Sequence, residues 1–363
     1  IYGRRMSTSG AAIGGAFGIS WEGNERTAPD VAHNYVEQDY LVVMEYEYSL
    51  SDHDIYGRLV YWNGSLLGSE FPIATPSAYD QNPVVAFSPY QDTYLVVWER
   101  RIGDPEFGQM DIYAQVVNWN GAKVGYEIAL DTGTARQEHP AIAYNSDWDE
   151  YLVVWQDKTA GNWDIVGRRV DGNGTLLGGE FVIESPGHDQ TWPDIAYNNT
   201  RNEYLVVWED RITASDWDIK ASRRNISGGG ISWFLISSSG TQRRMKPAVT
   251  YKFPADEYLV TYEYEWSASD LDIKQSRVRW DGVARQTDAV VSNASSIHEA
   301  RPAVASDGGW SNLVVWEDWR NAGSLDIDIY GDLERVYGFW GSVYRGMYPD
   351  ASSPLAGVSV ALF

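Results

Sequence analysis

Pairs of aspartates separated by one residue recur along the chain and are the first candidates for chemistry. Residues two apart in an extended strand point to the same face, so both carboxylates of a pair can reach one hard cation such as Ca²⁺, with loop carbonyls as further ligands. In the alternative interpretation each aspartate caps a turn or pairs with an arginine such as Arg58 or Arg168. The sequence thus makes calcium the candidate cofactor, at the pairs Asp52 and Asp54, Asp216 and Asp218, Asp270 and Asp272, and Asp326 and Asp328.

A second set of candidates lies beside six regularly spaced prolines, where the residue type changes from copy to copy. Loops on a rigid frame carry recognition, so a variable edge on a repeated scaffold is a candidate ligand site. Arginines there can bind carboxylates or sulfates, and Trp192 can stack on a sugar ring. In the alternative, the mixed charges only solvate a surface. The predicted ligand-binding rim comprises Asn82, Arg136, His139, Trp192, Arg243, Arg244, Lys246 and Arg301.

The sequence motifs of common reaction types are missing. There is no Gly-rich phosphate loop, His-Glu-x-x-His, Gly-x-Ser-x-Gly or EF-hand loop. The chain has no cysteine, which excludes disulfides, thiolate metal sites and a cysteine nucleophile. No acid or base stands out among the 51 acidic residues. The sequence therefore designates no catalytic residue and favours a protein without catalysis over an enzyme.

The elements that position these residues form a repeat of 53 to 57 residues, counted between successive prolines. About ten residues after each proline comes a Tyr-Leu-Val-Val-aromatic run or a variant of it, then an Asp-Ile pair, then in most copies a Gly-bearing turn. Asn-Gly and Asp-Gly between strand-like runs are favoured hairpin turns. The repeat prolines are Pro29, Pro83, Pro140, Pro193, Pro247 and Pro302.

Four short antiparallel strands per copy, without helical periodicity, predict an all-β fold built from β-propeller blades. The second strand is apolar on both faces, as expected of a strand between two neighbouring sheets. We predict six four-stranded blades, with seven as the alternative. The ring is expected to close when the N-terminal strands, which include Phe17-Gly18-Ile19, join the blade that begins at Pro302.

Charge restricts the partners of the protein. With 28 Lys and Arg against 51 Asp and Glu, the net charge is −23. Such a field repels nucleic-acid phosphates and anionic lipid, so no nucleic acid is expected as a partner. No apolar run is long enough to span a bilayer, so no membrane insertion is expected.

Two resemblances add to this interpretation. Tyr204 to Asp210 and, in part, Ile165 to Arg169 resemble segments of propeller arrays in secreted prokaryotic proteins, over about residues 1–333. The stretch Pro354 to Leu362 resembles a strand of a carboxypeptidase-regulatory-like (CnaB-type) β-sandwich. The resemblances imply a propeller over 1–336, a C-terminal extension over 337–363 that begins another module, and an extracellular or cell-surface location. The Ser-x-Asp-x-Gly-x-x-Trp loops of sialidases are absent.

Three functions remain open at this stage. The favoured one is a non-catalytic binding or structural module of a larger secreted protein, whose partner is a glycan, a protein or copies of itself. The second is a carbohydrate-active enzyme, a glycoside hydrolase or lyase, that uses rim carboxylates. The third is a calcium-stabilised filament or surface-layer subunit.

Overall fold

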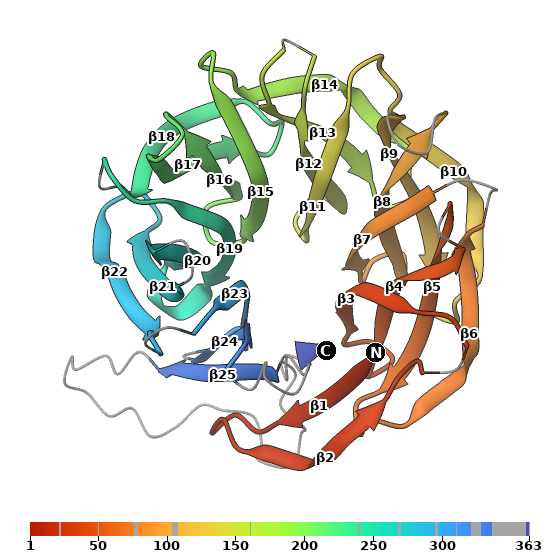
Figure 1. Cartoon of the computed structure of the whole chain (residues 1–363). Helices are drawn as coiled ribbons and strands as arrows, with labels where there is room; N and C mark the ends of the chain where they lie inside the picture. Colours follow the sequence, from red (N-terminus) through yellow and green to blue (C-terminus); the bar gives the residue numbers. More distant parts are fainter. Residues whose placement is uncertain are drawn as a thin grey trace.

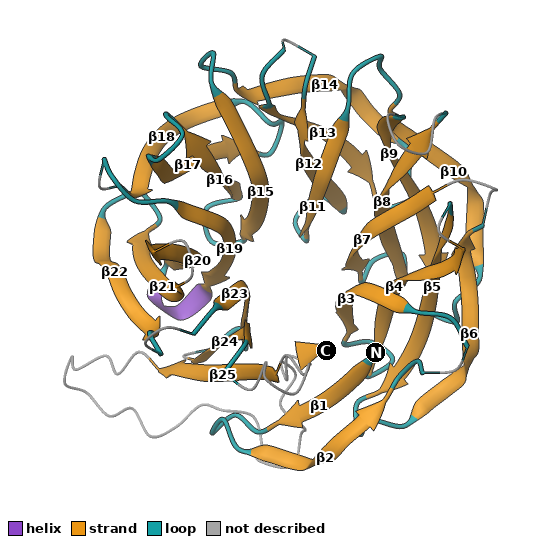
Figure 2. Ribbon diagram, in the orientation of Figure 1, coloured by secondary structure: helices purple, strands orange, loops and turns teal. Residues whose placement is uncertain are grey.

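The computed structural model describes residues 1–21, 23–49, 51–75, 79–103, 108–159, 161–238, 240–267, 270–294, 297–309, 311–320, 328–335 and 361–362. Within these residues the chain is all-β, and the 3₁₀ turn η1 (Phe253–Ala255) is its one helical element (Figure 2). No helix of this part is long and apolar enough to cross a membrane.

The proline repeats fold into sheets placed around a common axis, and we number them as blades 1 to 6 (Figure 1). Blade 1 has β3 (Arg26–Asn34), β4 (Asp39–Ser49), β5 (Asp52–Tyr61) and β6 (Leu66–Ala74); blade 2 has β7 (Tyr79–Ser88), β8 (Thr93–Ile102), β9 (Gln109–Asn118) and β10 (Lys123–Asp131). Blade 3 has β11 (Gln137–Asn145), β12 (Glu150–Asp157), β13 (Asp164–Asp171) and β14 (Leu176–Glu184); blade 4 has β15 (Asp189–Asn198), β16 (Glu203–Arg211), β17 (Trp217–Asn225) and β18 (Gly230–Ser237). Blade 5 has β19 (Arg244–Lys252), β20 (Glu257–Ser267), β21 (Asp270–Arg279) and β22 (Ala284–Ser292); blade 6 has β23 (Glu299–Ser306), β24 (Ser311–Asp318) and β25 (Asp328–Arg335).

The strands of each blade are antiparallel neighbours in chain order. The first strands β3, β7, β11, β15, β19 and β23 lie innermost, and each of the first five contacts the first strand of the next blade (Figure 1). The second strand is buried on both faces, as predicted; every residue of β12 is buried. Its large side chains, such as Trp98, Trp155 and Trp208, fill the space between adjacent blades.

The N-terminal strands differ from the prediction. The strands β1 (Tyr2–Met6) and β2 (Ala12–Gly18) pair with each other, and β1 pairs with β26 (Ala361–Leu362). In the described residues neither strand pairs with β25, so they do not extend the blade that begins at Pro302. Their own sheet instead packs on blade 1 through Ile19, and Gly10 lies against Leu333 of β25.

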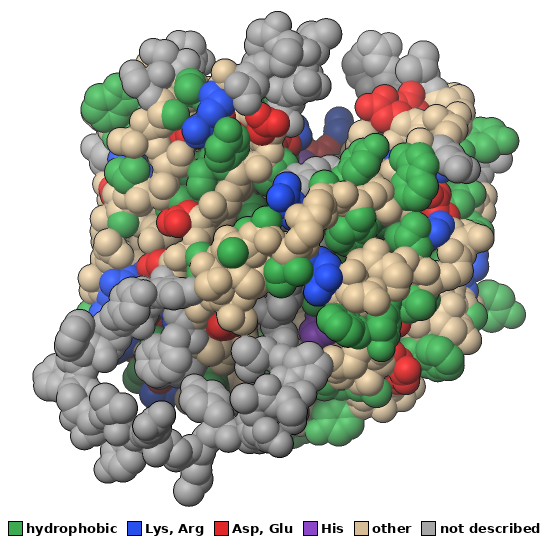
Figure 3. Space-filling view, turned by 90° about the horizontal axis from the view of Figure 1, so that it is seen from below, with side chains coloured by type: hydrophobic (Ala, Val, Ile, Leu, Met, Phe, Trp, Pro, Cys, Tyr) green, Lys and Arg blue, Asp and Glu red, His purple; other side chains and the backbone are tan. Residues whose placement is uncertain are grey.

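The outer surface is mixed in character. Hydrophobic side chains lie among polar and charged ones on the side of the ring shown in Figure 3, which is the lower side of Figure 1. On the outermost strands Tyr126 is 94% exposed and Trp233 is 67% exposed.

Candidate functional site

A backbone bulge before each repeat proline organises the site. The register of every innermost strand shifts at this point, as between Gln81 and Val84 or between Thr191 and Asp194. Proline has no N–H to donate, and a bulge is one of the few places where a strand accepts it. The residue before each proline has a positive φ of 45° to 53°, a costly backbone conformation for a side chain other than glycine; these residues are Ala28, Asn82, His139, Trp192, Lys246 and Arg301.

The bulge turns this residue's N–H toward the preceding blade, where a buried carboxylate or amide accepts it. The N–H of His139 donates to Glu99 Oε1 at 2.7 Å, that of Lys246 to Glu209 Oε1 at 2.7 Å, and that of Arg301 to Glu263 Oε1 at 2.8 Å. These glutamates lie in the second half of the second strands and are 1% exposed. The hydrogen bonds that these carboxylates accept therefore tie one blade to the next, a role that sequence analysis did not foresee.

Two aspartates one residue past the proline lie on innermost strands. Asp30 on β3 and Asp194 on β15 occupy the same position in blades 1 and 4, and both are partly exposed. The Asp30 carboxylate accepts the N–H of Val85 at 2.8 Å, and the Asp194 carboxylate accepts the N–H of Val249 at 2.7 Å. Each thus spans to the innermost strand of the next blade.

The ionisation of both carboxyl groups is shifted by their surroundings. Burial raises the pKa of Asp30 to about 6, against the effect of its hydrogen bonds from Val85 and Val31. Burial raises the pKa of Asp194 to about 6 as well, and the negative charge of Asp30 adds to the increase. Both carboxyls are therefore partly protonated near pH 6.

The structure brings three predicted rim residues together. The ring of His139 stacks on that of Trp192 with centroids 3.8 Å apart, and Lys246 Nζ lies 5.5 Å from the Trp192 ring. Burial and the charges of Arg211 and Lys246 lower the pKa of His139 to about 4, so its imidazole is neutral at pH 7. Because His139 already covers one face of Trp192, stacking of a sugar on that face is blocked.

The other predicted rim residues pair with acidic or main-chain groups. Asn82 donates to Glu99 at 3.1 Å, Arg301 pairs with Glu317 at 3.0 Å, and Arg136 pairs with Glu138. Arg243 donates to the carbonyl of Ala214. Arg244 does not reach the rim surface: its side chain is 2% exposed and contacts Ser237 and Asp288. Ligand binding by this rim stays a prediction.

The Asp-x-Asp pairs do come together as carboxylates. Burial raises the pKa of Asp54 to about 6, and the charge of Asp52 adds to the shift. Burial likewise raises the pKa of Asp218 to about 6, with a further contribution from Asp216. The pKa of Asp272 is also raised, by burial and then by the charge of Asp270. Oδ1 of Asp216 and Oδ1 of Asp218 are buried without a hydrogen bond. Asp328 begins β25, and Asp326 lies outside the described residues. No group of three or more His, Cys, Asp or Glu in the described part is placed to hold a metal, so calcium stays a prediction.

Mild acidification in the presence of EDTA is expected to raise the melting temperature by a few degrees. A carboxyl whose pKa is raised on folding binds its proton more tightly in the folded protein, so its contribution to stability grows as pH falls through the folded pKa. Asp30, Asp54, Asp194 and Asp218 all have values of about 6. The gain should appear between about pH 7 and about pH 5 in a calorimetric scan. Calcium bound to the aspartate pairs would reverse the trend when EDTA is omitted, and a melting temperature that falls with pH in EDTA contradicts these pKa shifts.

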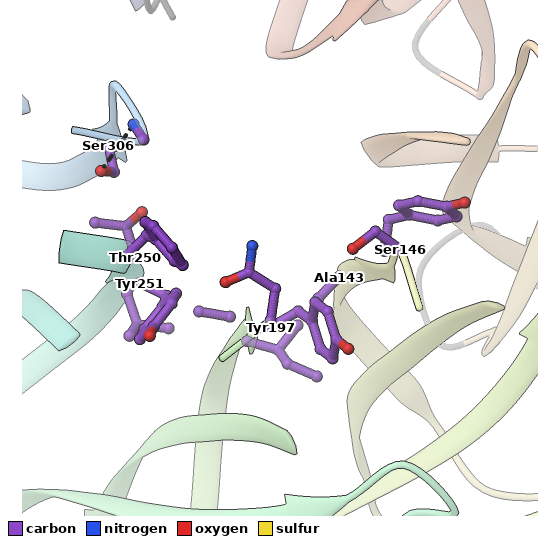
Figure 4. Close-up of a pocket in the computed structure, with 13 residues that line it drawn as sticks. Ala143, Ser146, Tyr197, Thr250, Tyr251 and Ser306 are labelled. Carbon is purple, nitrogen blue, oxygen red and sulfur yellow. Dashed lines mark hydrogen bonds between the residues drawn. The ribbon is translucent and has the colours of Figure 1, made fainter. Parts of the chain in front are cut away.

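A pocket of about 390 Å³ is lined by the later parts of the innermost strands of blades 3 to 6 and by the turns that follow them (Figure 4). The rim residues precede the repeat prolines, nearer the start of the same strands. Ile195 and Val249 belong to its lining, and Val249 is the residue whose N–H holds Asp194. The small residues Ala143 and Ala196 also line it, so they leave a hollow as well as allowing the blades to converge.

The sequence held one signal for the axial aspartates. The residue after the repeat proline is Val or Ala in four copies and Asp in two, Asp30 and Asp194. The interpretation above compared the residues before proline and missed this position.

Comparisons with known proteins identify the fold. No family model and no curated protein matches the sequence. Among solved structures, a protein of unknown function from Dyadobacter fermentans DSM 18053 is 10% identical with a TM-score of 0.57, over 85% of this chain and 94% of that one. The Hadza microbial sialidase Hz136 is 11% identical with a TM-score of 0.54, over 81% of this chain and 63% of that one. An α-L-arabinofuranosidase from Lactobacillus brevis is 11% identical with a TM-score of 0.47, over 74% of this chain and 96% of that one.

These likenesses confirm a propeller-like all-β fold and correct the functional prediction. The favoured hypothesis of a non-catalytic scaffold is corrected: one of the two neighbours above with a TM-score over 0.5 is named as a sialidase, and the comparisons back the enzyme alternative better. The error has a physical cause. Uniform repeats without catalytic motifs suggested a scaffold, but carboxylates from distant repeats can meet in a fold without forming any sequence motif.

Proposed function

We propose that the protein is a glycoside hydrolase whose reacting pair is Asp30 and Asp194 in the axial channel. The observation that carries the proposal is that two partly exposed, charge-coupled carboxyls occupy the same register on the innermost strands of different blades. Backbone N–H groups of Val85 and Val249 fix both side chains. The shared fold with a protein named as a sialidase is compatible with glycan chemistry but does not carry the argument.

The chemistry follows from the raised pKa values of the two carboxyls. Hydrolysis of a glycosidic bond uses one protonated carboxyl to protonate the leaving oxygen and one carboxylate to activate water or to attack the anomeric carbon. With both pKa values at about 6, a singly protonated pair is well populated near that pH. The N–H of Val85 fixes the orientation of the Asp30 carboxyl, and the N–H of Val249 fixes that of Asp194, while the acid gives its proton to the leaving oxygen.

We infer that this site lies on the axis of a ring with seven places. Blades 1 to 6 take six of them, and the β1–β2 sheet fills the seventh, because it contacts Leu333 of blade 6 and packs on blade 1. An extracellular or cell-surface location, where polymeric glycans occur, stays a prediction.

Incubation with a panel of neutral and acidic oligosaccharides tests the function. Reducing ends should be released from at least one of them, with a bell-shaped dependence of kcat/KM on pH centred near 6. The absence of hydrolysis across the panel, or a rate that is flat between about pH 5 and about pH 8, contradicts the proposal.

A further inference from the structure

The pocket next to Asp194 has the composition of a sugar site. Three tyrosines from equivalent positions of blades 3, 4 and 5, Tyr144, Tyr197 and Tyr251, line it together with Ser146 and Asn199. Figure 4 shows Tyr197 and Tyr251 on neighbouring strands around the open space. Aromatic faces beside hydroxyl and amide groups suit the apolar faces and hydroxyls of a sugar ring.

The tyrosines are held in place before any ligand arrives. Tyr197 Oη donates to Asp147 at 2.9 Å, and Tyr144 Oη donates to Asp149 at 2.9 Å. Tyr251 Oη lies 3.0 Å from Asp256 Oδ1. Because these hydroxyls are bound to fixed groups, binding a ligand costs little loss of side-chain freedom.

The electrostatic surroundings of the pocket select against negative charge. The lining contains no lysine, arginine or histidine among the described residues. The carboxylates of Asp147, Asp149 and Asp256 hold the tyrosine hydroxyls, and Asp256 is itself paired with Arg201 at 2.6 Å. A uronate, sulfate or sialic acid would add a negative charge beside these carboxylates, and the neighbouring cation Arg201 is already paired with Asp256.

We propose that this pocket binds an uncharged sugar unit of the substrate, which places the neighbouring glycosidic bond at Asp194. The inference rests on the proposed function for the bond that is cut, but binding in the pocket stands independently of catalysis. The arginines of the predicted rim suggested an acidic glycan as ligand. The pocket lies at the opposite end of the innermost strands, and its chemistry suits a neutral glycan instead.

The test measures binding with the Asp194→Asn protein by calorimetry, so that no turnover occurs. The probes are xylotetraose, cellotetraose and arabinotetraose, with tetragalacturonic acid as the acidic comparison. At least one neutral probe should bind, and the acidic probe should bind at least tenfold more weakly. Failure of all neutral probes, or tighter binding of tetragalacturonic acid, overturns the inference.

Two further substitutions in the Asp194→Asn protein test whether the probe binds in this pocket. Ser146→Trp and Asn199→Trp fill the pocket from the turn after an innermost strand, where the chain already carries Tyr35 and Phe253 in other blades. Each should weaken binding at least tenfold with little change in melting temperature. The matched control Ser227→Trp, an exposed residue of the β17–β18 turn, should bind like the parent. Unchanged binding in both pocket variants overturns the inference.

The same variants separate this inference from the proposed function. If the wild-type chain hydrolyses a glycan and adding Ser146→Trp leaves kcat/KM unchanged, the pocket assignment fails while the hydrolase stands. If a neutral probe binds and Ser146→Trp abolishes its binding, but the wild-type chain hydrolyses nothing, the pocket stands while the hydrolase fails.

Discussion

Replacing Asp30 or Asp194 by asparagine is expected to lower kcat by about 10³-fold, within the range that general acid–base groups contribute. Asparagine has nearly the same shape but neither holds nor releases the proton that the pair must move. Because the two carboxyls act as a unit, the double variant should lose little more activity than either single variant. Steady-state kinetics on a substrate found in the oligosaccharide panel measures all three.

Stability provides the control for this result. An asparagine oxygen can still accept the N–H of Val85 or Val249, and the variant no longer holds a buried carboxylate whose pKa is raised to about 6. The melting temperature at pH 7.5 should therefore stay the same or rise. Loss of activity together with a large fall in melting temperature would show that these residues serve the fold instead of the reaction.

Replacing Glu99 by alanine is expected to destabilise the protein by about 3 kcal/mol or more, because it leaves buried donors without an acceptor. Glu99 accepts Gln81 Nε2 at 2.7 Å, Asn82 Nδ2 at 3.1 Å and the N–H of His139 at 2.7 Å, so its loss affects two blades. Denaturant unfolding of the variant and of the parent measures the difference.

The chain itself supplies the matched control for Glu99→Ala. In blade 3 the corresponding residue is Gln156, whose Oε1 accepts the N–H of Trp192 at 3.0 Å, and Glu138 replaces Gln81 as its partner. Glu99→Gln should thus keep the tie to His139, because the amides of Gln81 and Asn82 can turn to present their oxygens. It should also remove the pH dependence caused by Glu99, whose pKa burial raises to about 7. Equal destabilisation by alanine and glutamine contradicts the assigned role.

Much of the fold could be predicted from local patterns. The Tyr-Leu-Val-Val-aromatic run is apolar on both faces, and β12 and β16 are accordingly buried between neighbouring sheets. Asn-Gly turns such as Asn63-Gly64 predicted the hairpins, and Gly64 has a φ of 89°. Closure could not be predicted, because the same third-strand pattern occurs both in β1 and in β25, and only packing decides which sheet each strand joins.

The candidate site was less predictable. A carboxylate reveals its role only through what surrounds it, and Glu99, Asp30 and Asp218 look alike in sequence. Folding ties Glu99 to the next blade, places Asp30 on an innermost strand where it accepts the N–H of Val85, and buries Asp218 beside Asp216. The stacking of His139 on Trp192 joins two blades whose equivalent residues are 53 positions apart in the chain, and no local pattern indicates it.

A crystal structure of the Asp194→Asn protein soaked with an oligosaccharide that the wild-type chain hydrolyses tests the central claim most directly. We expect electron density in the axial channel, with the glycosidic oxygen between residues 30 and 194 and an adjoining sugar unit beside Tyr197 and Tyr251. Density confined to the rim at His139, Trp192 and Lys246, or to the outer strands, would contradict the assignment of Asp30 and Asp194 as the reacting pair.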